Sequence, residues 1–232
     1  RSGGGGGFAM GELFVGNGID GQIVRVSSDG TSVINPWVDL PGTSNGLVRG
    51  SLYVDRTGVF GGDLIVATTV GQVWRIDSAG AMTMLVDLHT HLEGLVTVPD
   101  APSRYGPLAG RIIVGAEGVG QMFAVAVDGT TETFSLGVNI EDIDVVVPHE
   151  NFFGVNYGSS VLLGVQAEEF LPIAGDIVLT QESHTGVGLF RLWYDGANVQ
   201  AVELQAAPGS PTIAQWEHTT FADAGIQEIP PD

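Results

Sequence analysis

The stretch GDLIVATTVGQVWRIDSAGAMTMLVDL, at residues 62–88, contains three short runs of β-forming residues that are separated by glycine-containing turns. Two more stretches follow the same order, GELFVGNGIDGQIVRVSSDGTSVINPWVDL at 11–40 and GRIIVGAEGVGQMFAVAVDGTTETFSL at 110–136. Short runs rich in Val, Ile, Leu, Phe and Thr, without apolar residues at helical spacing, are typical of β-strands. The sequence therefore predicts a repeated unit with three strands in each copy.

The spacing of the repeat indicates its architecture. A Gly-Gln pair closes the first loop of each copy, and the pairs begin at Gly21, Gly71 and Gly120, which gives a period of 50 and then 49 residues. A weaker fourth copy, at 175–204, keeps the pattern with Leu189 in place of glutamine. Periods of this size in an all-β chain are typical of propeller blades. We predict an all-β β-propeller with about five four-stranded blades, or with four or six.

An apolar run ahead of three of the copies supplies the fourth strand of each blade. These runs read NGLVRGSLYV, EGLVTVP and EDIDVVVP, and we expect them to be the innermost strands. The copy at 11–40 lacks such a run, whereas QWEHTTFADAG at 215–225 has the pattern but no blade of its own. We therefore predict that the C-terminal strand pairs with the first blade and closes the ring, which would leave no open sheet edge.

The segments outside the repeat set the limits of the predicted domain. NFFGVNYGSSVLLGVQAEEF at 151–170 predicts a hairpin that is either an incomplete blade or an insertion. RSGGGGGFAM at 1–10 resembles a linker or a disordered segment more than a signal peptide, so we place it outside the fold. With 232 residues, 44% of them hydrophobic, the chain can bury a full core, and residues 11–232 are predicted to form a single propeller domain.

The charge of the chain excludes several classes of partner. There are 27 acidic residues against 8 basic ones, a formal net charge of −19, and all the basic residues are arginine. Such a field repels phosphate backbones and anionic membranes and concentrates cations near carboxylates, so we expect no nucleic-acid partner. No apolar run approaches the ~20 residues of a membrane helix, so we expect no membrane insertion. The absence of lysine excludes Schiff-base chemistry.

The absence of cysteine excludes disulfides and thiolate chemistry without fixing the compartment. A bacterial periplasmic or extracellular location is favoured over a cytoplasmic one, and the oligomeric state stays open.

A polar residue recurs at the start of each predicted innermost strand. The strands begin SNGLV, LEGLV, IEDID and WEHTT, and their second positions are Asn45, Glu93, Glu141 and Glu217. The first three of these are spaced by 48 residues each, so we expect the side chains to converge on one mouth of the channel. Crowded carboxylates either raise one another's pKa or bind a cation. Oxygen ligands suit Ca²⁺ or Mg²⁺, and an added imidazole shifts the preference toward Mn²⁺ or Zn²⁺.

Four other titratable residues are expected beside this ring. The second strand of each blade returns antiparallel to the same mouth, which brings Glu117 and Glu182 there. His91, in the stretch HTHLEGLVTVPD at 89–100, and His218 directly flank ring residues. Imidazole titrates near neutral pH, so the four residues are candidates for acid/base catalysis. The alternative is that polar side chains only line a water-filled channel.

Two of the motifs indicate a family. SNGL, which opens an innermost strand, and GQVWRID, which closes the next hairpin, resemble the superfamily of senescence marker protein, gluconolactonases and related calcium-dependent propeller hydrolases. The resemblance implies one divalent ion at the channel mouth and hydrolysis of lactones or phosphotriesters. It matches Asn45 to the family asparagine and Glu217 to the family glutamate, whereas Glu93 and Glu141 stand where Asn or Asp is usual. Streptogramin lyases and repeat-type binding propellers share the same blade pattern.

The leading hypothesis is therefore a metal-dependent hydrolase whose small-molecule substrate is a lactone, ester or phosphotriester. The candidate metal ligands are Asn45, Glu93, Glu141 and Glu217, and the candidate acid/base residues are His91, His218, Glu117 and Glu182. Two alternatives remain: a non-catalytic, calcium-stabilised module that binds glycan or protein, and a lyase that uses a histidine base. Fold alone does not decide among them.

Overall fold

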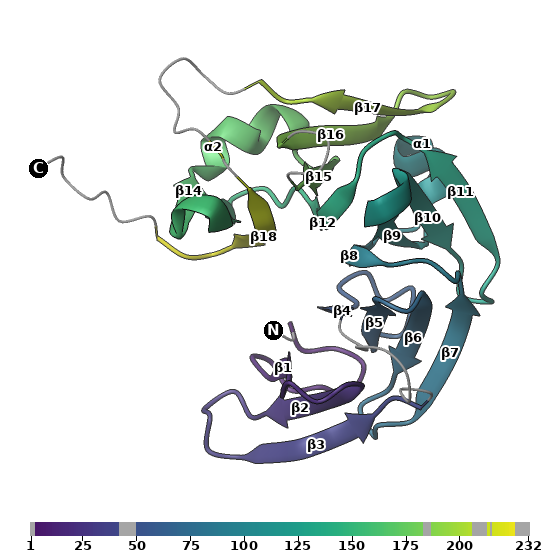
Figure 1. Ribbon diagram of the computed structural model, residues 1–232, viewed down its shortest axis with the longest axis vertical. Coiled ribbons are helices and arrows are strands. Elements are labelled where there is room, and N and C mark those ends of the chain that lie inside the picture. The colour runs from purple at the N-terminus through teal and green to yellow at the C-terminus, as the bar shows by residue number, and fades with distance from the viewer. Residues whose placement is uncertain (1–2, 42–49, 183–186, 206–212, 214, 226–232) are drawn as a thin grey trace, which may run out of the picture.

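A computed structural model describes residues 3–41, 50–182, 187–205, 213 and 215–225. The described residues form five antiparallel sheets, which follow one another along an arc around a common centre (Figure 1). We call these sheets blades 1 to 5. The prediction of an all-β, five-bladed propeller is confirmed.

Blades 2, 3 and 4 each contain four strands, and blades 1 and 5 each contain three in the described part of the chain. The strands of blade 1 are β1 (Leu13–Gly16), β2 (Gln22–Val26) and β3 (Val33–Asp39). The strands of blade 2 are β4 (Gly50–Val54), β5 (Leu64–Thr68), β6 (Gln72–Ile76) and β7 (Met82–Asp87). The strands of blade 3 are β8 (Glu93–Thr97), β9 (Ile112–Ala116), β10 (Gln121–Val125) and β11 (Thr131–Ser135). The strands of blade 4 are β12 (Ile140–Val145), β15 (Ile177–Gln181), β16 (Gly188–Tyr194) and β17 (Val199–Glu203). The strands of blade 5 are β13 (Asn151–Asn156), β14 (Val161–Val165) and β18 (Trp216–Ala222).

Helical structure is confined to short connections. The helices are α1 (Pro102–Tyr105), η1 (Gly106–Leu108), η2 (Glu117–Val119), η3 (Tyr157–Ser159), α2 (Ala167–Phe170) and η4 (Leu171–Ile173). No helix in the described ranges has both the length and the apolar character that crossing a membrane requires.

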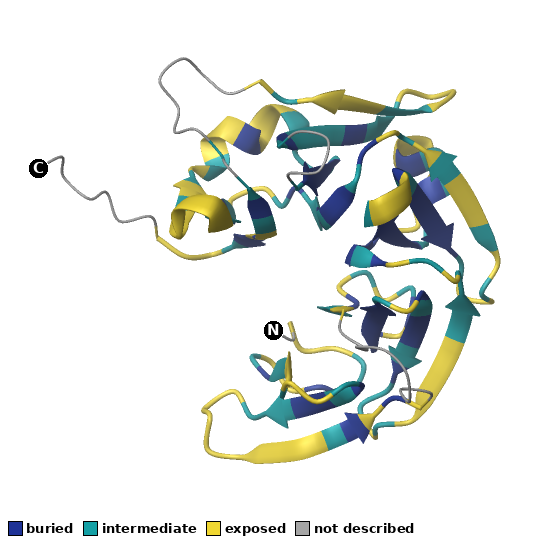
Figure 2. Cartoon of the chain, viewed as in Figure 1, coloured by how far each residue is buried: buried dark blue, intermediate teal, exposed yellow. Residues whose placement is uncertain are grey.

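The second strand of a complete blade forms the core with both of its faces. Every residue of β5, β9 and β15 is buried (Figure 2). Because side chains alternate along a strand, Ile65 packs toward blade 3 while Leu64 packs toward blade 1. Four apolar clusters arise in this way, one between each pair of consecutive blades from 1 to 5. Burial between blades therefore holds the arc together.

Blade 5 is assembled from two distant parts of the chain. The hairpin β13–β14 lies in the sequence between β12 and β15, so it is an insertion into blade 4 that supplies two strands of blade 5. The third strand is β18, which pairs with β13 in the register Phe152↔Phe221. The predicted closure of the ring by pairing the C-terminal strand with blade 1 is therefore wrong. The reason is an aromatic cluster, in which the Phe152 ring lies 5.3 Å from Phe221 and 6.1 Å from Trp216.

The N-terminal segment contacts the fold, although the sequence placed residues 1–10 outside it. Phe8 is only 4% exposed. Its ring lies edge-on to Phe14 at 4.8 Å and to Trp37 at 5.9 Å. An aromatic side chain amid glycines was enough to bury this part of the segment against blade 1.

Candidate functional site

The inner strands are irregular at the point where each carries its glutamate. The pairing of β8 with β9 shifts between Glu93 and Leu95, and the pairing of β12 with β15 skips Glu141. In β18, Glu217 and His218 together lie opposite one residue of β13, because the register shifts between Gly154 and Asn156. An extra residue of this kind bends a strand and redirects its side chains, often beside a functional site. A β-bulge therefore lies at or next to the glutamate of the inner strand in three blades, at one mouth of the channel.

Contacts between neighbouring inner strands fix these irregular starts. The Gly94 amide donates a hydrogen bond to Ser51 Oγ at 2.9 Å, which joins β8 to β4. Gly94 has φ 61°, and a Cβ there would lie 2.7 Å from the Cα of Asp142, so only glycine allows β8 and β12 to approach this closely. The Thr219 amide donates to Asp142 Oδ2 at 2.8 Å, which joins β18 to β12. The inner strands of blades 2 to 5 are thus linked in sequence.

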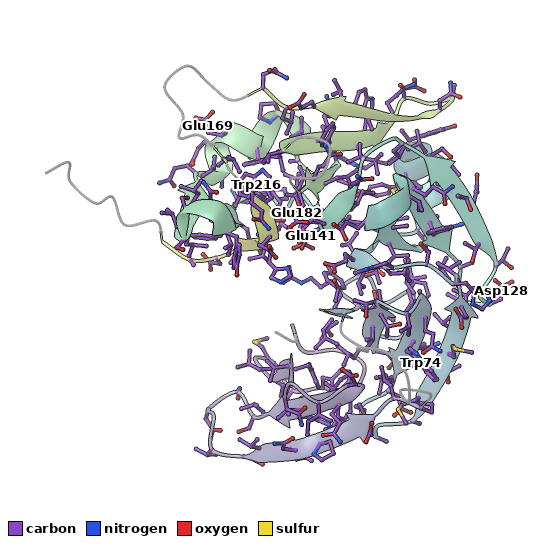
Figure 3. All side chains as sticks on the ribbon, viewed as in Figure 1. Trp74, Asp128, Glu141, Glu169, Glu182 and Trp216 are labelled. Atoms are coloured by element: carbon purple, nitrogen blue, oxygen red, sulfur yellow. The ribbon has the colours of Figure 1, made fainter. Side chains whose placement is uncertain are left out.

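The starts of three inner strands and the ends of two second strands bring five glutamates together, and we call them the glutamate cluster. Its members are Glu93, Glu117, Glu141, Glu182 and Glu217. Carboxylate oxygens of Glu117, Glu141 and Glu182 all lie within 4.8 Å of one another, and ligand atoms of His91, Glu93 and Glu117 form a second such group. Figure 3 shows Glu141 and Glu182 side by side at the centre of the arc. The Gln215 side-chain amide donates to both Glu182 and Glu217, which holds Glu217 beside the others.

Burial and mutual repulsion perturb the cluster. Glu141 is 5% exposed and makes no hydrogen bond or ion pair with the described residues. Its burial, followed by the charges of Glu93 and Glu217, raises its pKa from 4.5 to about 9. Burial also raises the pKa of Glu117, with further contributions from a hydrogen bond to Glu182 and from the Glu93 charge. The five carboxylates can stay this close only if some of them are protonated or if a cation binds between them.

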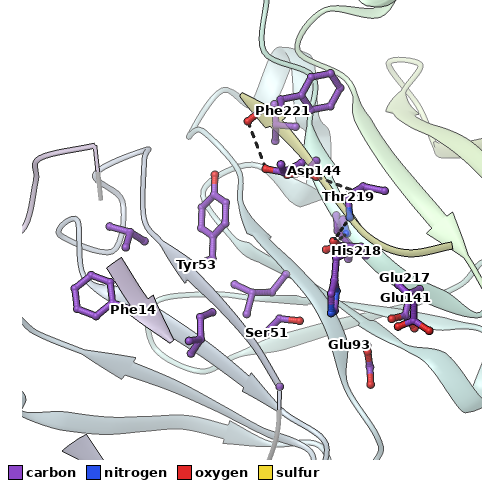
Figure 4. Close-up of a pocket in the computed structure, with 18 of the residues that line it drawn as sticks. Phe14, Ser51, Tyr53, Glu93, Glu141, Asp144, Glu217, His218, Thr219 and Phe221 are labelled. Carbon is purple, nitrogen blue, oxygen red and sulfur yellow. Dashed lines mark hydrogen bonds between the residues drawn. The ribbon is translucent and has the colours of Figure 1, made fainter. Parts of the chain in front are cut away.

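The two candidate histidines lie in different environments. His91 Nε2 lies 2.7 Å from Glu93 Oε1, and the His91 side chain is 45% exposed. His218 is exposed and lines the channel pocket, whose wall also includes Glu93, Glu141 and Glu217 (Figure 4). His218 is therefore the histidine that a molecule in the pocket can reach, whereas His91 is placed to orient or neutralise Glu93.

The pocket has a volume of about 780 Å³ and extends from the glutamate cluster along the channel. Beyond the cluster its wall includes the aromatic residues Phe14, Tyr53 and Phe221 together with Asp142 and Asp144. This volume suits a small organic molecule, since ligand pockets span about 300–1,000 Å³ and combine apolar walls with a few polar groups.

The structure brings together three of the predicted metal ligands, Glu93, Glu141 and Glu217, and two of the predicted acid/base residues. Glu117 and Glu182, expected as acid/base residues, stand among the carboxylates closest to Glu141. Asn45, a predicted metal ligand, lies outside the described residues.

Asp142 and Asp144 were missed, although their alternation with Ile143 and Val145 in the run EDIDVVV was a signal for two acids on one face of the strand. Burial raises the pKa of Asp142 to about 6 against hydrogen bonds from Thr219 and Ile143. The pKa of Asp144 is well above its usual range, because of burial and then the charge of Asp142.

No family model and no curated protein sequence matches the chain. Among solved structures, a streptogramin B lyase matches with a TM-score of 0.46 and 10% identity over 91% of this chain and 76% of that chain. Virginiamycin B lyase from Staphylococcus aureus matches with a TM-score of 0.47 and 13% identity, over 84% of this chain and 67% of that chain. BBS1N in complex with ARL6DN matches with a TM-score of 0.48 and 16% identity, over 88% of this chain and 48% of that chain.

These neighbours are propeller proteins, both enzymes and non-enzymes, and at such identities the likeness concerns the fold alone. The resemblance to the gluconolactonase superfamily gains no support from them. Fold and site together define a β-propeller with an acidic pocket in its channel.

Proposed function

We propose that the glutamate cluster binds a divalent cation, with Ca²⁺ as the first candidate, and that the protein is a metal-dependent hydrolase of a lactone, ester or phosphotriester. The observation that carries the proposal is Glu141. It is 5% exposed, lacks a hydrogen-bond or ion-pair partner among the described residues, and has the carboxylates of Glu117 and Glu182 within 4.8 Å. Three carboxylates this close together repel one another when they are ionised, and a shared cation would offset that repulsion.

The donor set fits a hard cation. Ca²⁺ takes six to eight oxygen ligands at about 2.3–2.6 Å, so oxygens on opposite sides of one ion stand about 5 Å apart. The carboxylate oxygens of Glu117, Glu141 and Glu182 are within this separation. Glu117 also belongs to the group with Glu93 and His91, whose imidazole makes Mn²⁺ or Zn²⁺ the next candidates.

Side chains of the pocket would carry out proton transfer and would bind the organic part of the substrate. A bound divalent cation would supply Lewis acidity, which polarises a carbonyl or phosphoryl oxygen and makes water more acidic. His218 is exposed in the pocket and is placed to accept and return a proton there. The rings of Phe14, Tyr53 and Phe221 contact the organic part of the substrate and exclude water from that end of the pocket.

One observation favours a second candidate, the non-catalytic, cation-stabilised binding module. Glu117 belongs to blade 3, and Glu141 and Glu182 belong to blade 4, so an ion between these carboxylates would link two blades whether or not chemistry followed. The lyase alternative uses His218 as the base and predicts activity that survives chelation.

The test combines metal binding with activity. Calorimetric titration of Ca²⁺ should give at least tenfold weaker binding for Glu141→Gln than for wild type, a loss of ~1.4 kcal/mol or more. Glu203→Gln, at an exposed position in the outer strand β17, removes the same charge away from the cluster and should bind as wild type does.

Wild type is then screened on lactones, aryl esters and phosphotriesters with and without chelator. Metal binding without turnover would leave the binding module. Turnover that survives chelation would remove the metal from the reaction, and an unsaturated elimination product in place of the hydrolysis product would identify the lyase. Equal Ca²⁺ affinity in Glu141→Gln and wild type would remove the metal centre itself.

A further inference from the structure

In the part of the chain that the structure describes, blade 1 lacks the strand that lines the channel in every other blade. In blades 2, 3 and 4 the inner strand covers the second strand, and every residue of β5, β9 and β15 is buried. The strand at the equivalent place in the repeat of blade 1 is β1, which pairs with β2 alone among the described strands. No residue of β1 is buried, and Val15 is 44% exposed. β1 is therefore a second strand without an inner strand.

The surroundings of β1 have room for the missing strand. Apolar clusters join consecutive blades from 1 to 5, but among the described residues no such cluster joins blade 5 back to blade 1. The channel pocket is lined on this side by Phe14, Val15 and Gly16. A second pocket of about 290 Å³ shares Gly16 and continues along blade 1 and blade 2. Among the described residues, the two pockets thus lie along β1, on the side where β4, β8 and β12 lie in the other blades.

We infer that β1 is the docking edge for an extended peptide segment of a partner protein, which adds to blade 1 as its inner strand. Alternate residues of an antiparallel strand point their N–H and C=O groups to opposite sides, so half of those of β1 face away from β2. An exposed edge of this kind recruits strands through main-chain hydrogen bonds, and pockets for alternate side chains give specificity. The chain shows what fits, because β8 (EGLVT) and β4 (GSLYV) occupy this position in the neighbouring blades.

Charge restricts the sequence of the partner strand. The channel face already carries the glutamate cluster, Asp142 and Asp144, and the whole chain has a net charge of −19. A further carboxylate on the incoming strand would be repelled, whereas lysine or arginine would be attracted. The partner segment is therefore largely apolar, as β8 is, and carries a basic side chain at the position that Glu93 has in β8, where it would face the glutamate cluster. This inference does not depend on the proposed hydrolase activity.

The probe is a labelled peptide with the sequence of residues 92–99 carrying Glu93→Lys, whose binding is followed by fluorescence anisotropy. We expect binding at least tenfold tighter than that of the same peptide with Glu93 retained. N-methylation of alternate peptide amides distinguishes strand addition from other contacts. The set that faces β1 should lose binding by at least tenfold, and the opposite set should retain it.

Two measurements on the protein test whether the peptide binds along β1. Amide hydrogen exchange at Phe14–Gly16 should slow when the peptide is added. Val15→Lys, at an exposed position in β1, should weaken binding at least tenfold, whereas the matched change Val33→Lys, at a 59% exposed position in β3, should leave it within a factor of two.

Several results would overturn the inference. The first is that the peptide does not bind. The second is that both N-methylated sets lose affinity equally. The third is that the peptide slows amide exchange outside β1 and not in it. Protection, before any peptide is added, of those Phe14–Gly16 amides that face away from β2 would show that a second copy or the chain itself occupies this edge, and would overturn it as well.

Discussion

Glu141 is the extra residue of the bulge in β12, and this position explains both its burial and the rise of its pKa to about 9. A carboxyl group whose pKa is higher in the folded state binds more protons when folded. The free energy of unfolding of metal-free protein should therefore fall as pH rises from about 4.5 to about 9. Glu141→Gln is neutral throughout this window and should show a shallower fall.

Thermal melts in chelator across the same pH range measure this difference. At neutral pH we expect Glu141→Gln to be the more stable protein by about 1 kcal/mol or more, which is ~2–4 °C for a chain of this length. Glu203→Gln should keep the wild-type pH dependence, because Glu203 is exposed in β17. Parallel curves for Glu141→Gln and wild type would show that Glu141 is ionised at little cost.

The two histidines give a second prediction at this scale. In metal-loaded protein, His218→Gln should lower turnover of a substrate found in the screen by ~10²–10⁴ while Ca²⁺ affinity holds. His91→Gln should instead change metal affinity more than turnover, because His91 Nε2 lies 2.7 Å from Glu93 Oε1 outside the pocket lining. Kinetics and calorimetry on both variants decide, and full turnover in His218→Gln would pass the proton transfer to another residue.

The candidate site was largely predictable because the repeat carries it. Glu93 and Glu141 recur at one interval, and the antiparallel return of the second strands brings Glu117 and Glu182 to the same mouth. The role of Gln215 was not predictable, since it depends on β18 lying beside blade 4. Residues next to β18, which lies outside the repeat, can be assigned neighbours only when the strands are placed in space.

At the scale of elements, the close approach of β8 and β12 gives a third prediction. Gly94 has φ +61°, with Asp142 backbone atoms 2.7 Å from a Cβ built there, whereas Gly137 has φ +69° and nothing within 4 Å. Alanine at either position incurs the strain of a positive φ, but only Gly94→Ala also forces two inner strands apart. We expect Gly94→Ala to lower the free energy of unfolding by ~1–3 kcal/mol more than Gly137→Ala does.

Urea unfolding of the two glycine variants measures this difference. Equal losses would show that the contact between Gly94 and Asp142 does not constrain the inner strands.

The strands themselves were predictable, because Leu64–Thr68 and its repeats are continuous apolar runs bounded by glycine. The bulges and the partner of β18 were not. The sequence of β18 fits an inner strand of any blade, and its choice of β13 depends on the packing of Trp216 and Phe221 around Phe152, which is far away in the chain.

At the scale of the whole molecule, an arc of five blades concentrates negative charge at its centre. The chain has a net charge of −19, and blades 3, 4 and 5 all direct glutamates into one pocket. A cation held by Glu117, Glu141 and Glu182 would reduce the repulsion and link blades 3 and 4. Stability and cation binding should therefore be coupled throughout the molecule.

Titration of Ca²⁺ into chelator-stripped protein, followed by calorimetry and by thermal melting, tests the metal centre most directly. We predict saturable binding of a single ion and a gain in the free energy of unfolding of RT ln(1 + [L]/Kd), which is ~2.7 kcal/mol at a hundredfold excess over Kd. The melting temperature should rise by several degrees and return to its starting value on chelation. No binding of Ca²⁺, Mg²⁺, Mn²⁺ or Zn²⁺, together with an unchanged melting curve, would contradict a metal centre in the glutamate cluster.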